Sequence, residues 1–109
     1  MAIDLSGDVF EAEVVQSPLP VLVDFWGPRC APCLALIPQV ENLEQKYESR
    51  FKITKVDASK NRRMCLNLKV LGLPTFLIYK EGKEVARLTG EALTIREIEA
   101  AMGMALEGK

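Results

Sequence analysis

Two cysteines separated by two residues are the part of this sequence best suited to chemistry. Cys30 and Cys33 follow a short apolar segment that ends at Trp26. At the first turn of a helix, unpaired backbone N–H groups and the positive end of the helix dipole would stabilise a thiolate at Cys30. The thiolate is the nucleophilic form of cysteine, and Cys33 would lie within its reach, one turn further on. The pattern therefore favours reversible dithiol–disulfide chemistry.

The other residue types exclude several chemistries. The chain has no histidine, so catalytic triads that depend on an imidazole base are impossible. A zinc site is disfavoured because zinc takes four ligands, usually Cys or His, and only Cys65 remains to join the pair. We expect Cys65 to be a buried core residue, since free cysteine packs as a small apolar side chain. The alternative, a regulatory thiol, would need exposure and a low pKa.

The composition is that of one small globular domain. The chain has 109 residues, 49% of them apolar and 27% charged, and its 14 basic and 15 acidic residues give a net charge of −1. We therefore expect a single domain over residues 1–109, acting as a monomer, with no nucleic-acid or membrane partner. Acidic residues come early and the first basic residue is Arg29, unlike a signal or transit peptide. The expected location is the cytoplasm.

Apolar periodicity places the cysteines between a strand and a helix. Strands are predicted over residues 3–5, 21–26, 51–57, 75–80 and 84–89. A first helix is predicted after a cap at Ser6, with an apolar face of Phe10, Val14 and Val15. Further helices are predicted over 30–47, over 61–69 and from a capping box at Thr94. This order predicts an α/β fold, a mixed sheet of about five strands covered on both faces by about four helices.

Residues 25–33, Phe-Trp-Gly-Pro-Arg-Cys-Ala-Pro-Cys, resemble the active-site signature of the thioredoxin family. The similarity extends over nearly the whole chain. Its other matches are the acid Asp24 in the preceding strand, Pro38 inside the long helix, Lys55, the loop Gly72-Leu73-Pro74-Thr75, and Gly90 beside the substrate groove. The resemblance implies a thioredoxin-like three-layer α/β/α sandwich with a cis peptide bond before Pro74.

The resemblance also implies a mechanism and its partners. Cys30 would attack a substrate disulfide to form a mixed disulfide, and Cys33 would resolve it. A thioredoxin reductase would supply electrons, client proteins would carry the disulfides, and no bound cofactor or metal is implied. Leu73 would offer its free backbone to an extended substrate segment. The residues expected to contact substrates are Trp26, Arg29, Ala31, Pro32, Leu73, Pro74 and Gly90.

Asp24 and Lys55 are the candidates for handling protons. A carboxyl group buried among apolar residues keeps its proton through a raised pKa, and Asp24 would then exchange a proton with Cys33. The alternative is a solvated aspartate at a strand end. Lys55 is the expected charge partner of Asp24 or, alternatively, a surface lysine. Trp26 is expected either to pack in the core or to shield the dithiol and contact a partner.

Three residues around the cysteines depart from the family pattern, which commonly has an acid, Trp and Gly in place of Pro28, Arg29 and Ala31. We hypothesise that Arg29 adds positive potential beside Cys30, stabilises its thiolate and makes the protein less reducing. The alternative is that Arg29 points into solvent and shapes partner choice. A solvated helix start is the interpretation of the basic cluster at Lys60, Arg62 and Arg63.

These observations predict a protein-disulfide reductase that works through Cys30 and Cys33. One alternative is a binding or chaperone-like module of the same fold with an idle dithiol. Another is a less reducing, dedicated oxidoreductase. The reductase is favoured because an idle site has no need to combine the two cysteines with Asp24 and Pro74.

Overall fold

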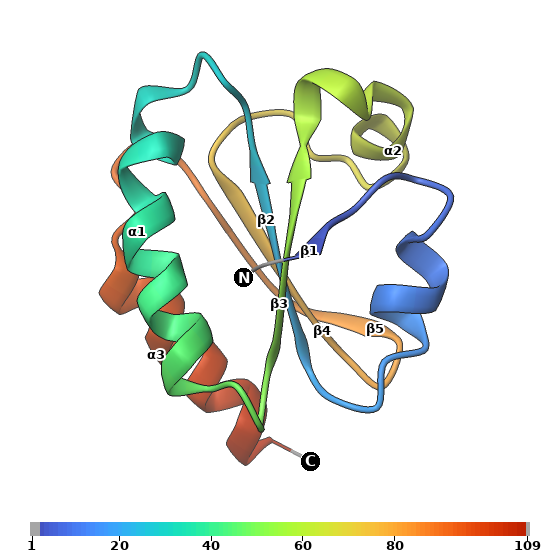
Figure 1. Ribbon diagram of the computed structural model, residues 1–109, viewed down its shortest axis with the longest axis vertical. Coiled ribbons are helices and arrows are strands. Elements are labelled where there is room, and N and C mark those ends of the chain that lie inside the picture. The colour runs from blue at the N-terminus through green and yellow to red at the C-terminus, as the bar shows by residue number, and fades with distance from the viewer. Residues whose placement is uncertain (1–2, 109) are drawn as a thin grey trace.

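Five strands form one mixed β-sheet in the order β1–β3–β2–β4–β5 (Figure 1). The computed structural model describes residues 3–108, so residues 1, 2 and 109 of the predicted domain lie outside the described part. The first three strands are parallel, and β4 and β5 complete the sheet as an antiparallel hairpin. Their bounds are Ile3–Asp4 for β1, Val21–Trp26 for β2, Lys52–Asp57 for β3, Thr75–Lys80 for β4 and Lys83–Thr89 for β5. The predicted mixed sheet of five strands is confirmed.

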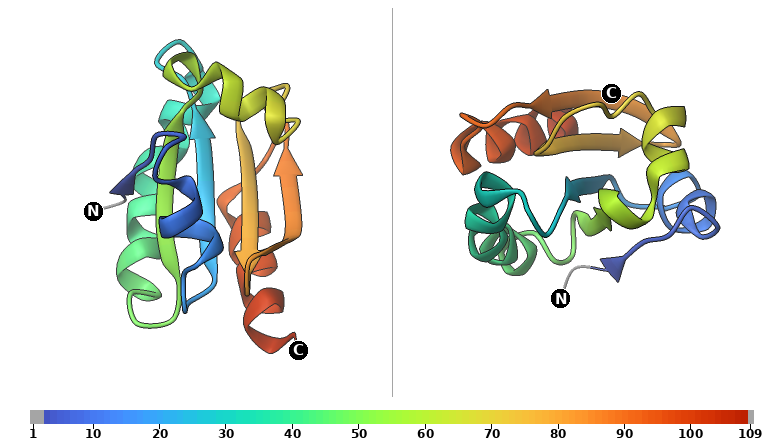
Figure 2. Two further views of the ribbon diagram at one scale, coloured as in Figure 1. Left: turned by 90° about the vertical axis from the view of Figure 1, so that its right-hand side faces the viewer. Right: turned by 90° about the horizontal axis from the view of Figure 1, so that it is seen from above.

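Helices cover both faces of this sheet and complete three layers. Two of them, α1 and α3, lie on one face, while α2 and the short helix η1 lie on the other (Figures 1 and 2). Their bounds are Glu11–Val15 for η1, Ala31–Lys46 for α1, Ala58–Lys60 for the single turn η2, Arg62–Asn67 for α2 and Ile95–Glu107 for α3. The predicted α/β/α sandwich is therefore confirmed. No helix among residues 3–108 is both long and apolar enough to cross a membrane.

The strand β2 is buried on both sides because its apolar side chains alternate between the two faces. Val23 and Phe25 pack in the cluster beneath η1 and α2, whereas Leu22 packs in the cluster beneath α1 and α3. All three side chains are fully buried. This continuous apolar run fixes β2 at the centre of the sheet, and its end at Trp26 fixes the start of the loop that carries the cysteines.

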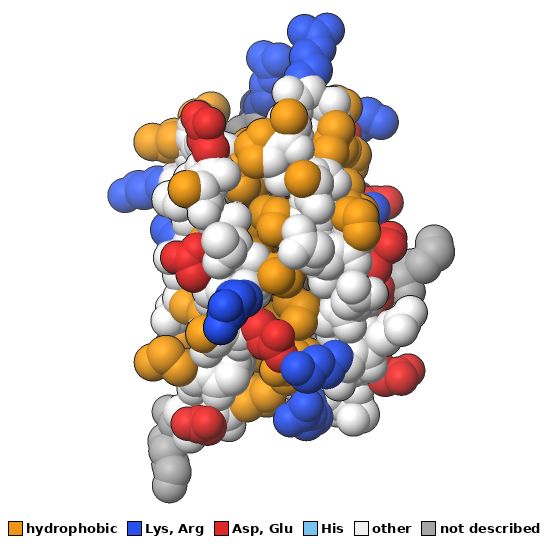
Figure 3. Space-filling view, turned by 90° about the vertical axis from the view of Figure 1, so that its left-hand side faces the viewer, with side chains coloured by type: hydrophobic (Ala, Val, Ile, Leu, Met, Phe, Trp, Pro, Cys, Tyr) orange, Lys and Arg blue, Asp and Glu red, His pale blue; other side chains and the backbone are white. Residues whose placement is uncertain are grey.

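The outer helices α1 and α3 are joined by a polar contact over an apolar seam. Seen from their side, hydrophobic side chains follow the line between the two helices and charged side chains gather across it (Figure 3). Glu99 of α3 accepts hydrogen bonds from Lys46 Nζ at 2.6 Å and from the Tyr47 hydroxyl at 2.8 Å. The contact holds the C-terminal end of α1 against α3.

The capping box of α3 forms as predicted, but the predicted cap of the first helix does not. Glu97 N–H donates to Thr94 Oγ1 at 3.3 Å, and Thr94 N–H donates to Glu97 Oε1 at 2.9 Å. Ser6 instead donates its hydroxyl to the carboxylate of Asp8, and η1 begins only at Glu11 without a side-chain cap. The prediction for Ser6 was wrong because this serine finds a partner two residues away in a turn.

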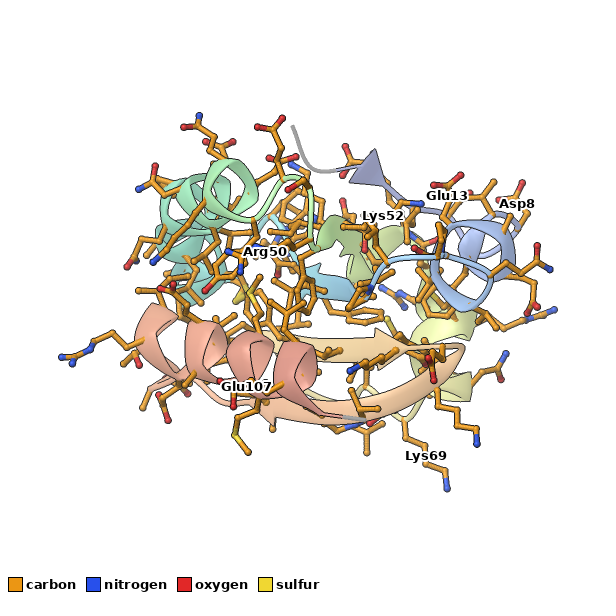
Figure 4. The ribbon with its side chains drawn as sticks, turned by 90° about the horizontal axis from the view of Figure 1, so that it is seen from below. Asp8, Glu13, Arg50, Lys52, Lys69 and Glu107 are labelled. Atoms are coloured by element: carbon orange, nitrogen blue, oxygen red, sulfur yellow. A yellow bond between two sulfur atoms is a disulfide. The ribbon has the colours of Figure 1, made fainter. Side chains whose placement is uncertain are left out.

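Hydrogen bonds from Lys52 join η1 to the sheet, at the end of the molecule away from the cysteines. Lys52 of β3 donates to the backbone carbonyl of Glu13 at 2.9 Å and to its carboxylate at 2.5 Å. Seen from below, the two labelled side chains lie next to each other (Figure 4). This pair helps to fix η1, whose residue Val14 is buried against the sheet.

Candidate active site

The two cysteines lie where β2 passes into α1, at the carboxyl ends of the parallel strands (Figure 1). Cys30 caps the N-terminus of α1, and Cys33 lies in the helix's first turn. Their sulfur atoms are joined in a disulfide of 2.04 Å. Ligand sites of open α/β sheets are common at this edge, where loops follow the strands. Cys30 and Cys33 are therefore paired, and they lie between a strand and a helix as the sequence predicts.

The two sulfur atoms differ in access and in their surroundings. Cys30 is half-buried, whereas only 1% of Cys33 is exposed. The backbone N–H of Cys33 donates to Cys30 Sγ at 3.2 Å. In the dithiol, this N–H and the positive end of the α1 dipole favour a thiolate on Cys30. An incoming sulfur atom can therefore reach Cys30, the residue whose charge the helix stabilises.

Asp24 is a buried carboxyl group on the face of the sheet that α1 covers. It follows Leu22 by two residues, so it shares the Leu22 face of β2. Only 2% of its surface is exposed, which excludes the solvated alternative. Burial raises the pKa of Asp24 from an ordinary 3.8 to about 7, and the charge of Lys55 offsets part of this rise. The carboxyl group therefore changes protonation near neutral pH.

Lys55 is shared between two acids, of which the sequence identified only one. It lies opposite Asp24 in the β2–β3 register and opposite Asp4 in the β1–β3 register. Its Nζ atom lies 4.0 Å from Asp4 Oδ1 and 5.7 Å from the centroid of the Trp26 ring. Lys55 is half-buried rather than a free surface lysine. Asp4 was missed because its nearness to Lys55 depends on strand pairing.

A second loop meets the cysteine loop through Leu73. The Leu73–Pro74 peptide bond is cis, as the resemblance implies. A Cβ atom added to Gly27 would lie 3.2 Å from Leu73 Cδ1, so the two loops are in close contact. Gly90 N–H donates to the Pro74 carbonyl at 3.1 Å, which places Gly90 beside this loop. Neither the N–H nor the carbonyl of Leu73 has a hydrogen-bond partner within residues 3–108.

A hollow of about 710 Å³ opens beside Cys30. Arg29 and Leu73 line it, as expected of residues that contact a substrate, and so does Pro28. Arg62 lines it as well, although the sequence indicated only a solvated helix start. This residue was missed because its approach to the cysteine loop depends on how α2 packs on the sheet.

Three other residues predicted to contact substrates, Ala31, Pro32 and Trp26, do not line this hollow. Ala31 is exposed and Pro32 is half-buried at the first positions of α1. Trp26 is half-buried and lines a separate hollow of about 420 Å³ with Asp4 and Lys60. Its indole N–H is buried without a hydrogen-bond partner among residues 3–108. The structure thus gathers Arg29 and Leu73 around Cys30 and turns Trp26 toward a neighbouring hollow.

Cys65 lies in the core, as predicted. It belongs to α2, only 7% of it is exposed, and burial raises the pKa of its thiol. A reactive thiol needs the opposite conditions, exposure and a lowered pKa. The third cysteine is therefore a packing residue beneath α2 and takes no part in the site.

Comparisons with known proteins agree with this geometry. The family model described as Thioredoxin matches residues 1–103. The thioredoxin of Acetoanaerobium sticklandii is 45% identical over 97 residues, which cover 89% of this chain and 92% of that protein. The thioredoxin of Peptoclostridium acidaminophilum is 39% identical over 100 residues, covering 92% and 91%. Thioredoxin 1 of a Nostoc species is 36% identical over 89 residues, covering 82% and 83%.

Proposed function

The chain belongs to the thioredoxin family and is a thiol–disulfide oxidoreductase that reduces protein disulfides, and we propose that Cys30 is its nucleophile and Cys33 its resolving thiol. The observation that carries this assignment is the asymmetry of the pair. Cys30 is accessible and accepts a backbone N–H at the start of α1, while Cys33 is buried behind it. A nucleophile must reach its substrate, whereas a resolving thiol needs only to reach its neighbour.

The reaction transfers two electrons in two exchange steps. The Cys30 thiolate attacks one sulfur of the client disulfide, and the other client sulfur leaves as a thiolate that takes up a proton. Cys33 then loses its proton and attacks Cys30 Sγ in the mixed disulfide. The second client sulfur leaves and is protonated, which leaves the client reduced and Cys30–Cys33 oxidised, the state of the present structure.

Asp24 is proposed to take the proton that Cys33 loses. Its carboxyl group lies under the helix that carries Cys33, and its pKa of about 7 lets it accept or release a proton at neutral pH. No histidine is available in the chain for this role. Lys55 is a positioning residue here, because its charge acts on Asp24 and not on the reacting sulfur atoms.

The client segment is proposed to lie along Leu73. The unpartnered N–H and carbonyl of this residue suit pairing with an extended chain, in the manner of an added strand. The hydrogen bond between Gly90 and Pro74 fixes this loop beside the cysteines. Ala31 and Pro32, at the start of α1, are proposed to flank the approach, with Trp26 at the neighbouring hollow. Such pairing would position a client disulfide without requiring a particular client sequence.

We propose further that a thioredoxin reductase returns the electrons and that the protein acts in the cytoplasm as a monomeric, single-domain protein. A dithiol that is consumed in each cycle needs a reducing partner and a reducing compartment. Clusters on both faces of one sheet support a single domain. A binding module with an idle dithiol is less favoured, because the accessible Cys30 lies next to a helix N-terminus that activates it.

Three cysteine variants test the assignment with a model protein disulfide as substrate. Cys30→Ser is expected to abolish reduction, and Cys33→Ser is expected to accumulate a mixed disulfide on Cys30, seen by mass spectrometry. Cys65→Ser, the matched control, should turn over like the wild type because its thiol is buried in the core and is not part of the disulfide. Turnover by Cys30→Ser, or a mixed disulfide on Cys33 in place of Cys30, would contradict the assigned roles.

A further inference from the structure

Two arginines from distant parts of the chain face the hollow beside Cys30. Arg29 comes from the loop between β2 and α1, and Arg62 is the first residue of α2. Both are exposed, and both line the same hollow of about 710 Å³ with Cys30 and Leu73. In Figure 3, side chains of Lys and Arg (blue) project from the top of the molecule. A client disulfide that reaches Cys30 therefore approaches a hollow that two arginines line.

No acidic residue among residues 3–108 forms an ion pair with either of these arginines. The residues that line the hollow include no Asp or Glu, and the same holds for an adjoining hollow of about 370 Å³ that shares Arg62 and Leu73. Neither guanidinium group has a hydrogen bond or ion pair within the described chain. By contrast, Arg87 is paired with Glu84 at 2.8 Å. Since the whole chain has a net charge of −1, the positive charge is a local feature of the site.

We infer that this hollow, the basic pocket of Arg29, Arg62 and Leu73, selects client segments that carry a carboxylate next to the disulfide. The inference rests on the proposed function, because it concerns the substrates that Cys30 attacks. A guanidinium group offers parallel N–H donors that match a carboxylate. Arg29 precedes Cys30 directly, so an acid beside the client cysteine would meet these donors while its sulfur meets Cys30 Sγ.

We expect the basic pocket to increase the association rate of acidic client segments more than the stability of the complex. Complementary charges steer association and align the partners, and the effect falls as salt screens them. The apolar side of the pocket, formed by Leu73 and Ala58, provides no competing polar partner for the client carboxylate. The preference should therefore be modest, faster for acidic segments, and sensitive to ionic strength.

Two disulfide peptides that differ only in Glu or Gln beside the cysteine test this directly. Each is mixed with the reduced protein, and the second-order rate constant for release of peptide thiol is measured. Each rate constant is divided by that of the same peptide with a small neutral dithiol, which removes differences in intrinsic reactivity. For the wild type we expect the normalised Glu-to-Gln ratio to be about two to five at low salt. It should approach one in about 1 M salt.

Variants of α2 assign the preference to the pocket. Arg62→Gln should reduce the ratio about twofold, and Arg62→Lys should keep part of it because the charge remains. Arg63→Gln is the matched control, since it removes the same charge from the next residue, which lines a different hollow with Phe10 and Met64. Its ratio should equal that of the wild type.

The outcomes separate this inference from the proposed function. If both peptides are reduced but the wild-type ratio is one, the acidic preference is overturned while the reductase assignment stands. An equal loss of ratio in Arg62→Gln and Arg63→Gln would also overturn it, because net charge and not the pocket would then set the rate. If neither peptide is reduced, the proposed function fails and the inference fails with it.

Discussion

Asp24 is a residue whose environment opposes its own charge. Only 2% of it is exposed, and burial raises its pKa from 3.8 to about 7. The folded chain therefore binds a proton at Asp24 more tightly than the unfolded chain does. By linkage, the free energy of unfolding falls as the pH rises between these two values. A buried acid kept at this cost is consistent with the proton-transfer role proposed for it.

Asp24→Asn should accordingly stabilise the protein at alkaline pH. Well below pH 4, Asp24 is protonated in both the folded and the unfolded wild type, so it is as neutral as the Asn of the variant. The free energies of unfolding of the two proteins should then nearly coincide. Above about pH 7 the wild type bears the full penalty, and the variant should be more stable by on the order of 4 kcal/mol. Urea unfolding across this range measures the difference. Glu91→Gln, an exposed acid-to-amide control, should show no such trend, and a pH-independent gain in Asp24→Asn would refute the explanation.

Arg29 should make the protein less reducing. It is exposed beside Cys30 without an ion partner in residues 3–108, so its charge is available to the thiolate. Arg29→Trp removes that charge, destabilises the reduced form and should lower the reduction potential by about 5–20 mV. Equilibration with a glutathione buffer measures the potential. Arg63→Trp is the control, and equal potentials for wild type and Arg29→Trp would reject the hypothesis.

At the scale of elements, three strands place one lysine between two acids. Asp4 of β1, Lys55 of β3 and Asp24 of β2 occupy one row across the sheet. The outer acid lies 4.0 Å from Lys55 Nζ and is exposed, while the inner acid is buried. β1 has only two residues, yet it brings a competing charge to the lysine that acts on Asp24.

Removing that competitor should lower the pKa of Asp24. Asp4→Asn removes a negative charge beside Lys55, so the surroundings of Asp24 become more positive and favour its carboxylate. Lys55→Gln should have the opposite effect and raise the pKa above about 7. Titration of the Asp24 carboxyl carbon by NMR reads both changes. If Asp4→Asn leaves the titration of Asp24 where it is, the row has no electrostatic role.

Local signals predicted the elements better than they predicted contacts between elements. The strand Thr75–Lys80 and the capping box at Thr94 match the prediction because both depend on neighbouring residues. The position of Arg62 beside Cys30 did not follow from the sequence, nor did the shared position of Lys55. Both depend on how separate elements pack and pair, which no short window of sequence encodes. The cysteines and Asp24 were identified because motif and burial pattern coincide there.

At the scale of the whole molecule, one sheet carries two cores. Neighbouring residues of β2 serve opposite clusters, with Leu22 on the side of α1 and α3 and Val23 on the side of η1 and α2. Loss of packing on one face therefore removes support from the strand that the other face needs. The site depends on both, because β2 leads into Cys30 and α1 covers Asp24.

Met102 provides the test of this cooperation. Its side chain is fully buried beneath α3, so Met102→Ala should lower the free energy of unfolding by about 2–5 kcal/mol. Met104, in the same helix, is 75% exposed, and Met104→Ala should change it by less than about 0.5 kcal/mol. Because both faces share β2, the helical circular dichroism and the reactivity of the Cys65 thiol, which is buried in the opposite core beneath α2, should shift to the same new midpoint. Melting of α3 ahead of the exposure of Cys65 would show instead that the two cores unfold independently.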